Sequence, residues 1–120
     1  MNRVPCTIIL AAGKGTRMGS SDTPKVCFPL NGTPAIVRAM RVYRNAGVKQ
    51  FLVVVGNLAE KVMATVTPEF PETNYAFQPE QNGTADAVAC ALAGARFLQD
   101  DDDVLVVAGD RFLQIGRAHV

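Results

Sequence analysis

Residues 4–19 read VPCTIILAAGKGTRMG, an apolar run that passes directly into a cationic, glycine-rich loop. Residues 4–10 are continuously apolar rather than alternating, which is typical of a parallel strand buried on both faces. In the loop, Gly13 and Gly15 lack Cβ atoms and can turn successive backbone N–H groups towards one point, where they would bind phosphate. The segment therefore predicts a buried strand that leads into a phosphate-binding loop.

Two better-known glycine loops do not fit this spacing. A P-loop needs a Lys followed directly by Ser or Thr, but here Gly15 follows Lys14. A dinucleotide-binding loop needs the pattern G-x-G-x-x-G, and Gly19 comes one residue too late for it. On the loop alone, a simple glycine turn with incidental surface charge stays open as an alternative.

Downstream, predicted strands alternate with predicted helices. The strands are expected at residues 4–10, 50–55, 74–77 and 104–108, and the helices at 34–46, 58–67 and from 83 onward. Asn31-Gly32 predicts a tight turn, Thr33 the N-cap of the first helix, and Gly47 its end. This alternation favours an α/β fold, a mostly parallel sheet with helices on both faces, in which ligands bind beyond the carboxyl ends of the strands.

Composition limits the classes of function. The chain has 120 residues, of which 48% are hydrophobic and 19% charged, with a formal net charge of +1, as expected for one globular domain without a basic surface for nucleic acid or membranes. No apolar stretch approaches the ~20 residues of a membrane span. Three cysteines, an odd number without metal-ligand spacing, indicate free thiols and a reducing compartment, so we expect a cytoplasmic protein.

Three motifs together carry a family resemblance. They are LAAGKGTRM at residues 10–18 with the following Pro24-Lys25, QPEQNGTADAV at residues 78–88, and VVAGD at residues 106–110. This combination resembles the nucleoside-triphosphate transferase family, the sugar-1-phosphate nucleotidylyltransferases. Within that family it is most similar to the pyrophosphorylase domain of the bifunctional UDP-N-acetylglucosamine enzymes. The resemblance implies a Rossmann-like sheet with strand order 3-2-1-4.

The resemblance also implies a reaction and a set of site residues. The family joins a nucleoside triphosphate to a sugar-1-phosphate and releases pyrophosphate, with Mg²⁺ as cofactor. By resemblance, Arg17 and Lys25 are the catalytic residues and Asp110 binds the metal. The nucleotide-binding residues carried over from the motifs are Leu10, Ala11, Ala12, Gly13, Gly15, Gln78, Gly83 and Thr84.

The second motif favours UTP, with dTTP and ATP left open. An amide such as that of Gln78 can offer both a donor and an acceptor to the mixed edge of uracil or thymine. Asp86 has no expected role beyond favouring the start of a helix. The alternative functions are a non-catalytic nucleotide-binding or regulatory module on the same fold, and a nucleotidyltransferase for another acceptor, of the molybdenum-cofactor or cytidylyl type.

The end of the chain differs from the family pattern. The family domain is longer, so residues 1–114 are expected to be its N-terminal half. Residues 115–120, IGRAHV, resemble the translation of a sequencing adapter and are expected to be a non-native tail. We therefore expect this chain to be inactive by itself, and residues 104–108 to form an exposed apolar edge strand that lowers solubility. The sugar and the oligomeric state are not predicted.

Overall fold

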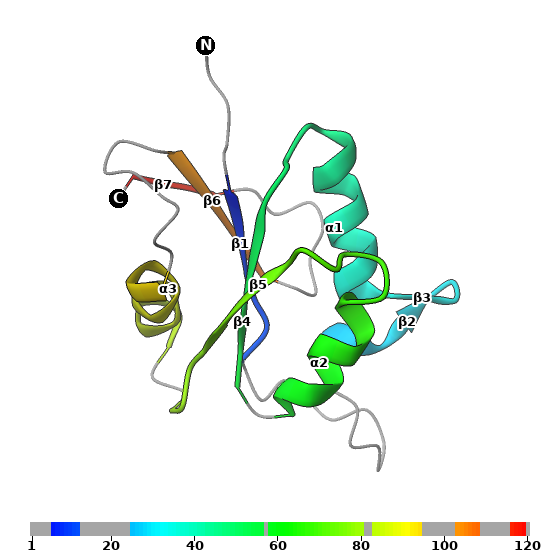
Figure 1. Cartoon of the computed structure of the whole chain (residues 1–120), viewed down its shortest axis with the longest axis horizontal. Helices are drawn as coiled ribbons and strands as arrows, with labels where there is room; N and C mark the ends of the chain where they lie inside the picture. The colour runs from blue at the N-terminus through cyan, green and yellow to red at the C-terminus, as the bar shows by residue number, and fades with distance from the viewer. Residues whose placement is uncertain are drawn as a thin grey trace.

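The strands form a sheet with helices on both faces (Figure 1). The computed structural model describes residues 6–12, 25–56, 58–80, 83–94, 103–108 and 116–119. Within these residues, five strands pair in the order β5-β4-β1-β6-β7. Their bounds are β1 Cys6–Leu10, β4 Phe51–Val55, β5 Asn74–Phe77, β6 Asp103–Ala108 and β7 Gly116–His119. The pairs among β5, β4, β1 and β6 are parallel, which confirms the predicted order 3-2-1-4 for the four predicted strands.

The continuous apolar runs follow from cover on both faces of the sheet. In β4, Phe51, Val53 and Val55 belong to the apolar cluster on the side of α1 and α2, whereas Leu52 and Val54 belong to the cluster on the side of α3. All five side chains are at most 5% exposed. Since successive side chains of a strand point to opposite faces, a strand covered on both sides is apolar throughout.

The helices start and end close to where the sequence predicts. They are α1 Ala35–Asn45, α2 Ala59–Val66 and α3 Thr84–Gly94, with a short 3-10 helix, η1 Lys25–Cys27. In Figure 1, α1 and α2 lie on one side of the sheet and α3 on the other. Gly47 ends α1 as predicted, because its φ of 107° suits glycine and its N–H donates to the Arg44 carbonyl at 3.0 Å.

The start of α1 corrects one prediction. Asn31 and Gly32, with φ values of 54° and 85°, do form a tight turn, and this turn joins β2, Pro29–Leu30, to β3, Thr33–Pro34. Thr33 therefore lies in a strand, and the residue that caps α1 is Pro34, without a side-chain hydrogen bond. The predicted N-cap at Thr33 is wrong, because Thr33 pairs with Leu30 in the hairpin and does not cap the helix.

The far edge of the sheet corrects a second prediction. β7 pairs antiparallel with β6, with Asp103 opposite His119 and Val106 opposite Gly116. Residues 103–106 of β6 are therefore paired on that side, so β6 is not the edge strand that the sequence predicts. Low solubility stays a prediction, and so does the suggested origin of residues 115–120.

The thiols agree with the sequence analysis. Cys6, Cys27 and Cys90 are all free, and the first two are buried. Burial raises the pKa of the Cys6 thiol to about 11, and it also raises the pKa of Cys27. In the part of the chain that the structure describes, no helix is long and apolar enough to cross a membrane.

Candidate functional site

The ends of β1 and β5 are bonded to two neighbouring residues of β4. The N–H of Ala11, directly after β1, donates to the Val54 carbonyl at 2.8 Å. The N–H of Gln78, directly after β5, donates to the neighbouring Val55 carbonyl, also at 2.8 Å. Two motifs that are far apart in the sequence therefore meet at the carboxyl edge of the sheet, on either side of β4.

Gly56, which follows β4, fills the space between these two segments. A Cβ atom at this position would lie 3.1 Å from the Cβ of Ala12, 3.1 Å from the carbonyl oxygen of Gln78 and 3.2 Å from that of Ala12. Ordinary carbon contacts are about 3.5–4.0 Å, so a side chain does not fit without movement of the backbone. The three strand ends thus pack through their backbones, which leaves little freedom in the position of Gln78.

The Gln78 side chain is buried and hydrogen-bonded. It is 4% exposed, and its Nε2 donates to Asp86 Oδ2 at 2.8 Å and to the Gly83 carbonyl at 3.4 Å. Gly83 has a φ of 93°, and its carbonyl also accepts from the N–H of Ala87 at 3.1 Å in the first turn of α3. Glycine is needed at this φ because other L-residues rarely adopt it. The turn into α3 therefore holds the Gln78 amide in one place.

Comparison with known proteins agrees with this geometry. The model of the MobA-like NTP transferase domain matches residues 7–114. The chain belongs to this nucleotidyltransferase family. Among its curated relatives, the bifunctional protein GlmU of Kineococcus radiotolerans is 42% identical over 85 residues, which are 71% of this chain and 17% of that protein. The bifunctional protein GlmU of Ruegeria pomeroyi is 43% identical over 108 residues, which are 89% of this chain and 23% of that protein.

The fold is also found among solved structures. The crystal structure of HddC from Yersinia pseudotuberculosis, complexed with GMP-PN, superposes with a TM-score of 0.73 at 24% identity and covers 89% of this chain and 48% of that one. The chain thus spans about a fifth of the length of the curated relatives and about half of this solved chain. The family resemblance drawn from the three motifs is confirmed.

The structure describes part of the predicted nucleotidyltransferase site. Leu10 is half-buried at the end of β1. Ala11 and Ala12 are 4% and 2% exposed, and Ala12 lies beside Gly56. Gln78 and Gly83 lie together, as described above, and Thr84 is the first residue of α3. Lys25 begins η1, which packs against α1 and α2. The remaining predicted residues, Gly13, Gly15, Arg17 and Asp110, lie outside the described residues.

The magnesium site stays a prediction. Asp110 lies two residues beyond the end of β6 in the sequence, and Ala108, the last residue of β6, is in register with Leu10 of β1. A carboxylate is a suitable ligand for Mg²⁺, which prefers oxygen donors. Within the described ranges, no group of three His, Cys, Asp or Glu side chains could hold a metal ion.

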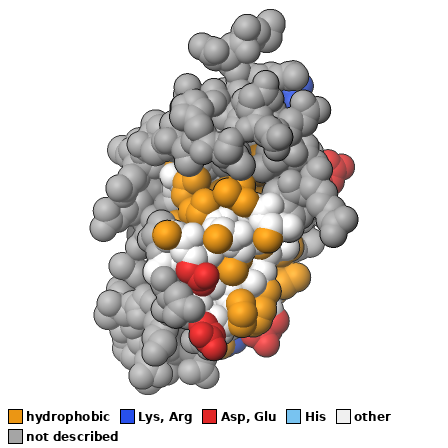
Figure 2. All heavy atoms as spheres, turned by 90° about the vertical axis from the view of Figure 1, so that its left-hand side faces the viewer, with side chains coloured by type: hydrophobic (Ala, Val, Ile, Leu, Met, Phe, Trp, Pro, Cys, Tyr) orange, Lys and Arg blue, Asp and Glu red, His pale blue; other side chains and the backbone are white. Residues whose placement is uncertain are grey.

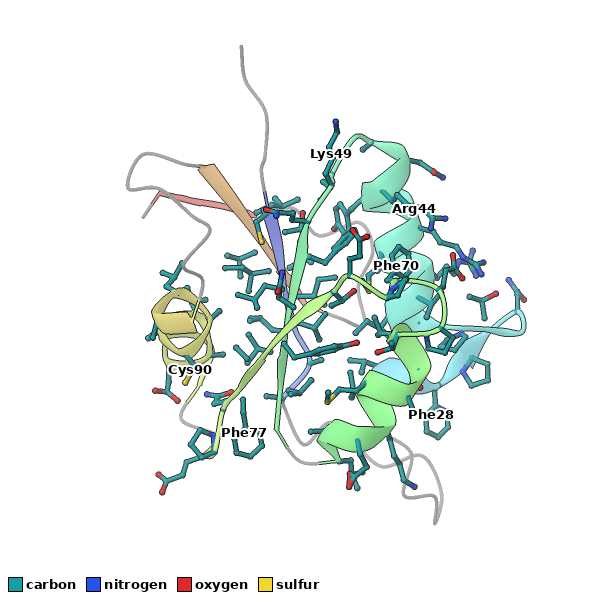
Figure 3. All side chains as sticks on the ribbon, viewed as in Figure 1. Phe28, Arg44, Lys49, Phe70, Phe77 and Cys90 are labelled. Carbon is teal, nitrogen blue, oxygen red and sulfur yellow. The ribbon has the colours of Figure 1, made fainter. Side chains whose placement is uncertain are left out.

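The structure contains a pocket that is not at the predicted site. It has a volume of about 530 Å³ and lies at the amino end of β4, between Arg44, Lys49 and Phe70. In Figure 3, Lys49 and Arg44 lie in the upper half of the view and Phe70 near its middle, whereas Phe77, which directly precedes Gln78, lies towards the bottom. The charge of Arg44 on its rim is already engaged, because Arg44 pairs with Glu69 at 3.3 Å and lies over the Phe70 ring at 4.8 Å. The pocket therefore lies away from the carboxyl edge of the sheet, where the motifs meet and where the sequence predicts the nucleotidyltransferase site.

Sequence reasoning missed two residues of the site. Gly56 appears in the sequence only as the residue after a strand, and Asp86 only as an acidic residue near a helix start. The structure brings both residues into contact with predicted site residues at the carboxyl edge of the sheet. Gly56 packs against Ala12 and Gln78, and Asp86 accepts a hydrogen bond from Gln78. The one available signal was the position of Gly56 directly after a buried strand, where close approach of another backbone is common.

Proposed function

We propose that the protein catalyses transfer of a nucleotidyl group from a nucleoside triphosphate, preferably UTP, to a sugar-1-phosphate, with release of pyrophosphate. The main support is that two family motifs meet at the carboxyl edge of the sheet, where the N–H groups of Ala11 and Gln78 donate to adjacent residues of β4. Family membership and the GlmU relatives support the class of reaction. Free thiols fit the cytoplasmic location that we expect for such an enzyme.

The chemistry requires positive charge more than a general base. The phosphate of a sugar-1-phosphate is already ionised, so it can attack the α-phosphorus in line without losing a proton to the protein. The obstacle is repulsion between two anions, each like pair costing about 1 kcal/mol at ~4 Å in water and several times more in a partly buried site. Positioning and charge stabilisation therefore account for most of the catalysis.

The residues that answer this need are those named by the family resemblance. We assign Arg17 to the triphosphate and the departing pyrophosphate, and Lys25 to the α-phosphate and the incoming sugar phosphate. Asp110 would hold Mg²⁺, which when bound offsets the negative charge of the phosphate oxygens. Each assignment is supported by the motif match and by the chemistry of the side chain. These side chains are the guanidinium of Arg17, the ammonium of Lys25 and the carboxylate of Asp110.

The test is an assay for pyrophosphate with the product of the complete open reading frame that contains this sequence. With UTP, Mg²⁺ and a panel of sugar-1-phosphates, we expect pyrophosphate release with at least one sugar. Arg17→Ala and Lys25→Ala should each lower kcat/KM by about 10²–10³, as for other preorganised charge-stabilising groups. The matched control is Lys49→Ala, which removes an exposed cation from the amino end of β4 and should leave the rate unchanged.

Two alternatives give different results in the same assay. A non-catalytic nucleotide-binding module would bind UTP and release no pyrophosphate with any sugar-1-phosphate. A transferase for another acceptor is favoured by the family description itself, which names the MobA-like group. It would show turnover with a cofactor-type or alcohol-phosphate acceptor and another nucleotide, and none with the sugar panel.

A further inference from the structure

We propose that Asp86 is a positioning residue that selects the base, because it fixes the Gln78 amide with its carbonyl oxygen towards the nucleotide. This inference rests on the proposed function, since it assumes that Gln78 contacts the base of a bound nucleoside triphosphate. It concerns the choice of nucleotide rather than the transfer step. Its basis is the hydrogen bond of 2.8 Å between Gln78 Nε2 and Asp86 Oδ2.

The chemistry of Asp86 fixes which end of the amide faces it. An ionised carboxylate can only accept hydrogen bonds, so the group that it meets at 2.8 Å must be the amide nitrogen and not the amide oxygen. The second acceptor of the same nitrogen, the Gly83 carbonyl at 3.4 Å, also cannot donate. Both N–H bonds of Gln78 Nε2 therefore point to protein acceptors, and the other polar atom of the side chain, Oε1, is an acceptor.

Burial makes this orientation costly to reverse. Gln78 is 4% exposed, so a flipped amide would place its oxygen against the Asp86 carboxylate and leave its N–H groups without their partners. A buried polar group without a partner costs about 1–3 kcal/mol, apart from the repulsion between two oxygens. Asp86 itself lies in the first turn of α3, where the N-terminal end of the helix favours a negative charge. The pair is therefore held with one polarity.

This polarity distinguishes among bases. An acceptor placed opposite position 3 of a pyrimidine bonds to the N3–H of uracil or thymine. Opposite cytosine it meets the lone pair of N3, which repels it. The sequence suggested that Gln78 offers both a donor and an acceptor to the base; the contacts with Asp86 and Gly83 engage the donor, so the base meets the acceptor. The expected ligand is a nucleoside triphosphate whose base carries N–H at position 3.

A second acidic residue near the Gln78–Asp86 pair provides a control for the loss of negative charge. Figure 2 shows the side of the molecule formed by α3, where hydrophobic side chains are prominent and acidic side chains lie beside them. Glu80, two residues after Gln78, is an exposed acid of the same segment. Glu80→Gln therefore removes the same charge close to the site without removing the contact with Gln78, which makes it the matched control.

The experiment compares the affinity for UTP and for CTP, measured by calorimetry with Mg²⁺ on the product of the complete open reading frame. In Asp86→Asn, the new amide can donate or accept, so Gln78 can turn over and present its N–H groups to cytosine. We expect the wild type to prefer UTP, and we expect the ratio of UTP to CTP affinity to fall by about tenfold in Asp86→Asn, the size of one misdirected hydrogen bond. Glu80→Gln should keep the ratio of the wild type.

Two further variants protect the test against misfolding. Asp86→Glu keeps an acceptor-only group and should keep most of the preference, whereas Asp86→Ala frees the amide and should lose it; circular dichroism checks that each variant is folded. If Asp86 has only a structural role, its substitution should lower the affinities for UTP and CTP by the same factor and leave their ratio unchanged.

The outcomes separate this inference from the proposed function. If the wild type binds UTP and releases pyrophosphate but Asp86→Asn keeps its UTP to CTP ratio within twofold, the role of Asp86 is wrong and the proposed function stands. Equal affinity of the wild type for UTP and CTP also overturns the role of Asp86, without any variant. If the wild type binds no nucleoside triphosphate, the proposed function itself fails and this inference fails with it.

Discussion

Gly56→Ala should damage both the stability and the nucleotide site, although the change adds a single methyl group. Where space is open and φ is negative, Gly→Ala usually stabilises a protein by about 0.4–1 kcal/mol through the unfolded chain. At Gly56 the new Cβ would lie 3.1–3.2 Å from one side-chain carbon and two backbone oxygens. To reach an ordinary carbon contact, the Ala12 segment has to move by roughly 0.4 Å or more. Overpacking of this kind costs about 1–3 kcal/mol, which outweighs the gain.

The same movement should weaken nucleotide binding. Groups in a binding site need to be held within about 0.5 Å of their productive position, so a shift of this size at Gln78 should lower the affinity for UTP by about tenfold. Thermal unfolding should give a melting temperature lower by about 4–8 °C. Calorimetric titration with UTP gives the affinity.

The control is Gly47→Ala. Gly47 has a φ of 107°, which strains any other residue, but nothing lies within 4 Å of a Cβ built there. Gly47 lies next to the amino end of β4, whereas Gln78 is bonded to the last residue at the carboxyl end of this strand. We expect a comparable loss of stability, about 1–2 kcal/mol, with unchanged UTP affinity. If Gly56→Ala is as stable as the wild type and binds UTP equally well, the rim is not packed as tightly as the structure indicates.

Three more measurements test other parts of the structure. Met40→Ala, at a side chain 0% exposed, should lower the free energy of unfolding by about 2–5 kcal/mol in a urea titration, whereas Val42→Ala, 42% exposed on the same helix, should change it by less than about 0.5 kcal/mol. With its pKa raised to about 11, Cys6 has a thiolate fraction of only about 10⁻³ at pH 8, so iodoacetamide should modify the half-buried Cys90 first; early modification of Cys6 by peptide mapping would contradict its burial. Hydrogen bonds from Arg41 lower the pKa of Glu69 below its ordinary value of 4.5. The ion pairs of Glu69 therefore stabilise the fold above pH 4.5, and this stabilisation is lost as the pH falls through the lowered pKa of the folded protein. Glu69→Gln should be less stable than the wild type at pH 7, and as stable as the wild type once the pH is below the Glu69 pKa of both the folded and the unfolded protein.

The parallel sheet was predictable because its signals are local. Residues buried on both faces must be apolar throughout, so β4 appears in the sequence as an unbroken run, and helix α1 appears as apolar residues at helical spacing that end at Gly47. The family motifs then gave the strand order. These features depend on the chain near each residue and on general rules of α/β sheets.

The features that were missed depend on pairing between segments. β3 consists of Thr33–Pro34, and two residues are too short to give a periodic pattern; the strand exists because the turn at Asn31 brings them opposite Pro29–Leu30. β7 likewise forms through its pairing with β6. Asp86 was predicted only as a helix-start acid, since its contact with Gln78 requires the turn at Gly83 to bring residues eight positions apart together.

The two halves of the proposed site should respond differently to mutation. To read a base, a protein must place one donor or acceptor to within about 0.5 Å. In the proposed site, the group with this task is the buried Gln78 amide, which is held by Asp86 and by the packed strand ends. To offset phosphate charge, a cation needs only to be near, because Coulomb energy falls slowly with distance. Gly56→Ala and Asp86→Asn should therefore change the discrimination between nucleotides, whereas Arg17→Ala should slow the reaction by the same factor with every nucleotide. A change in the UTP to CTP ratio upon Arg17→Ala would contradict this division, because it would mean that the cation takes part in reading the base.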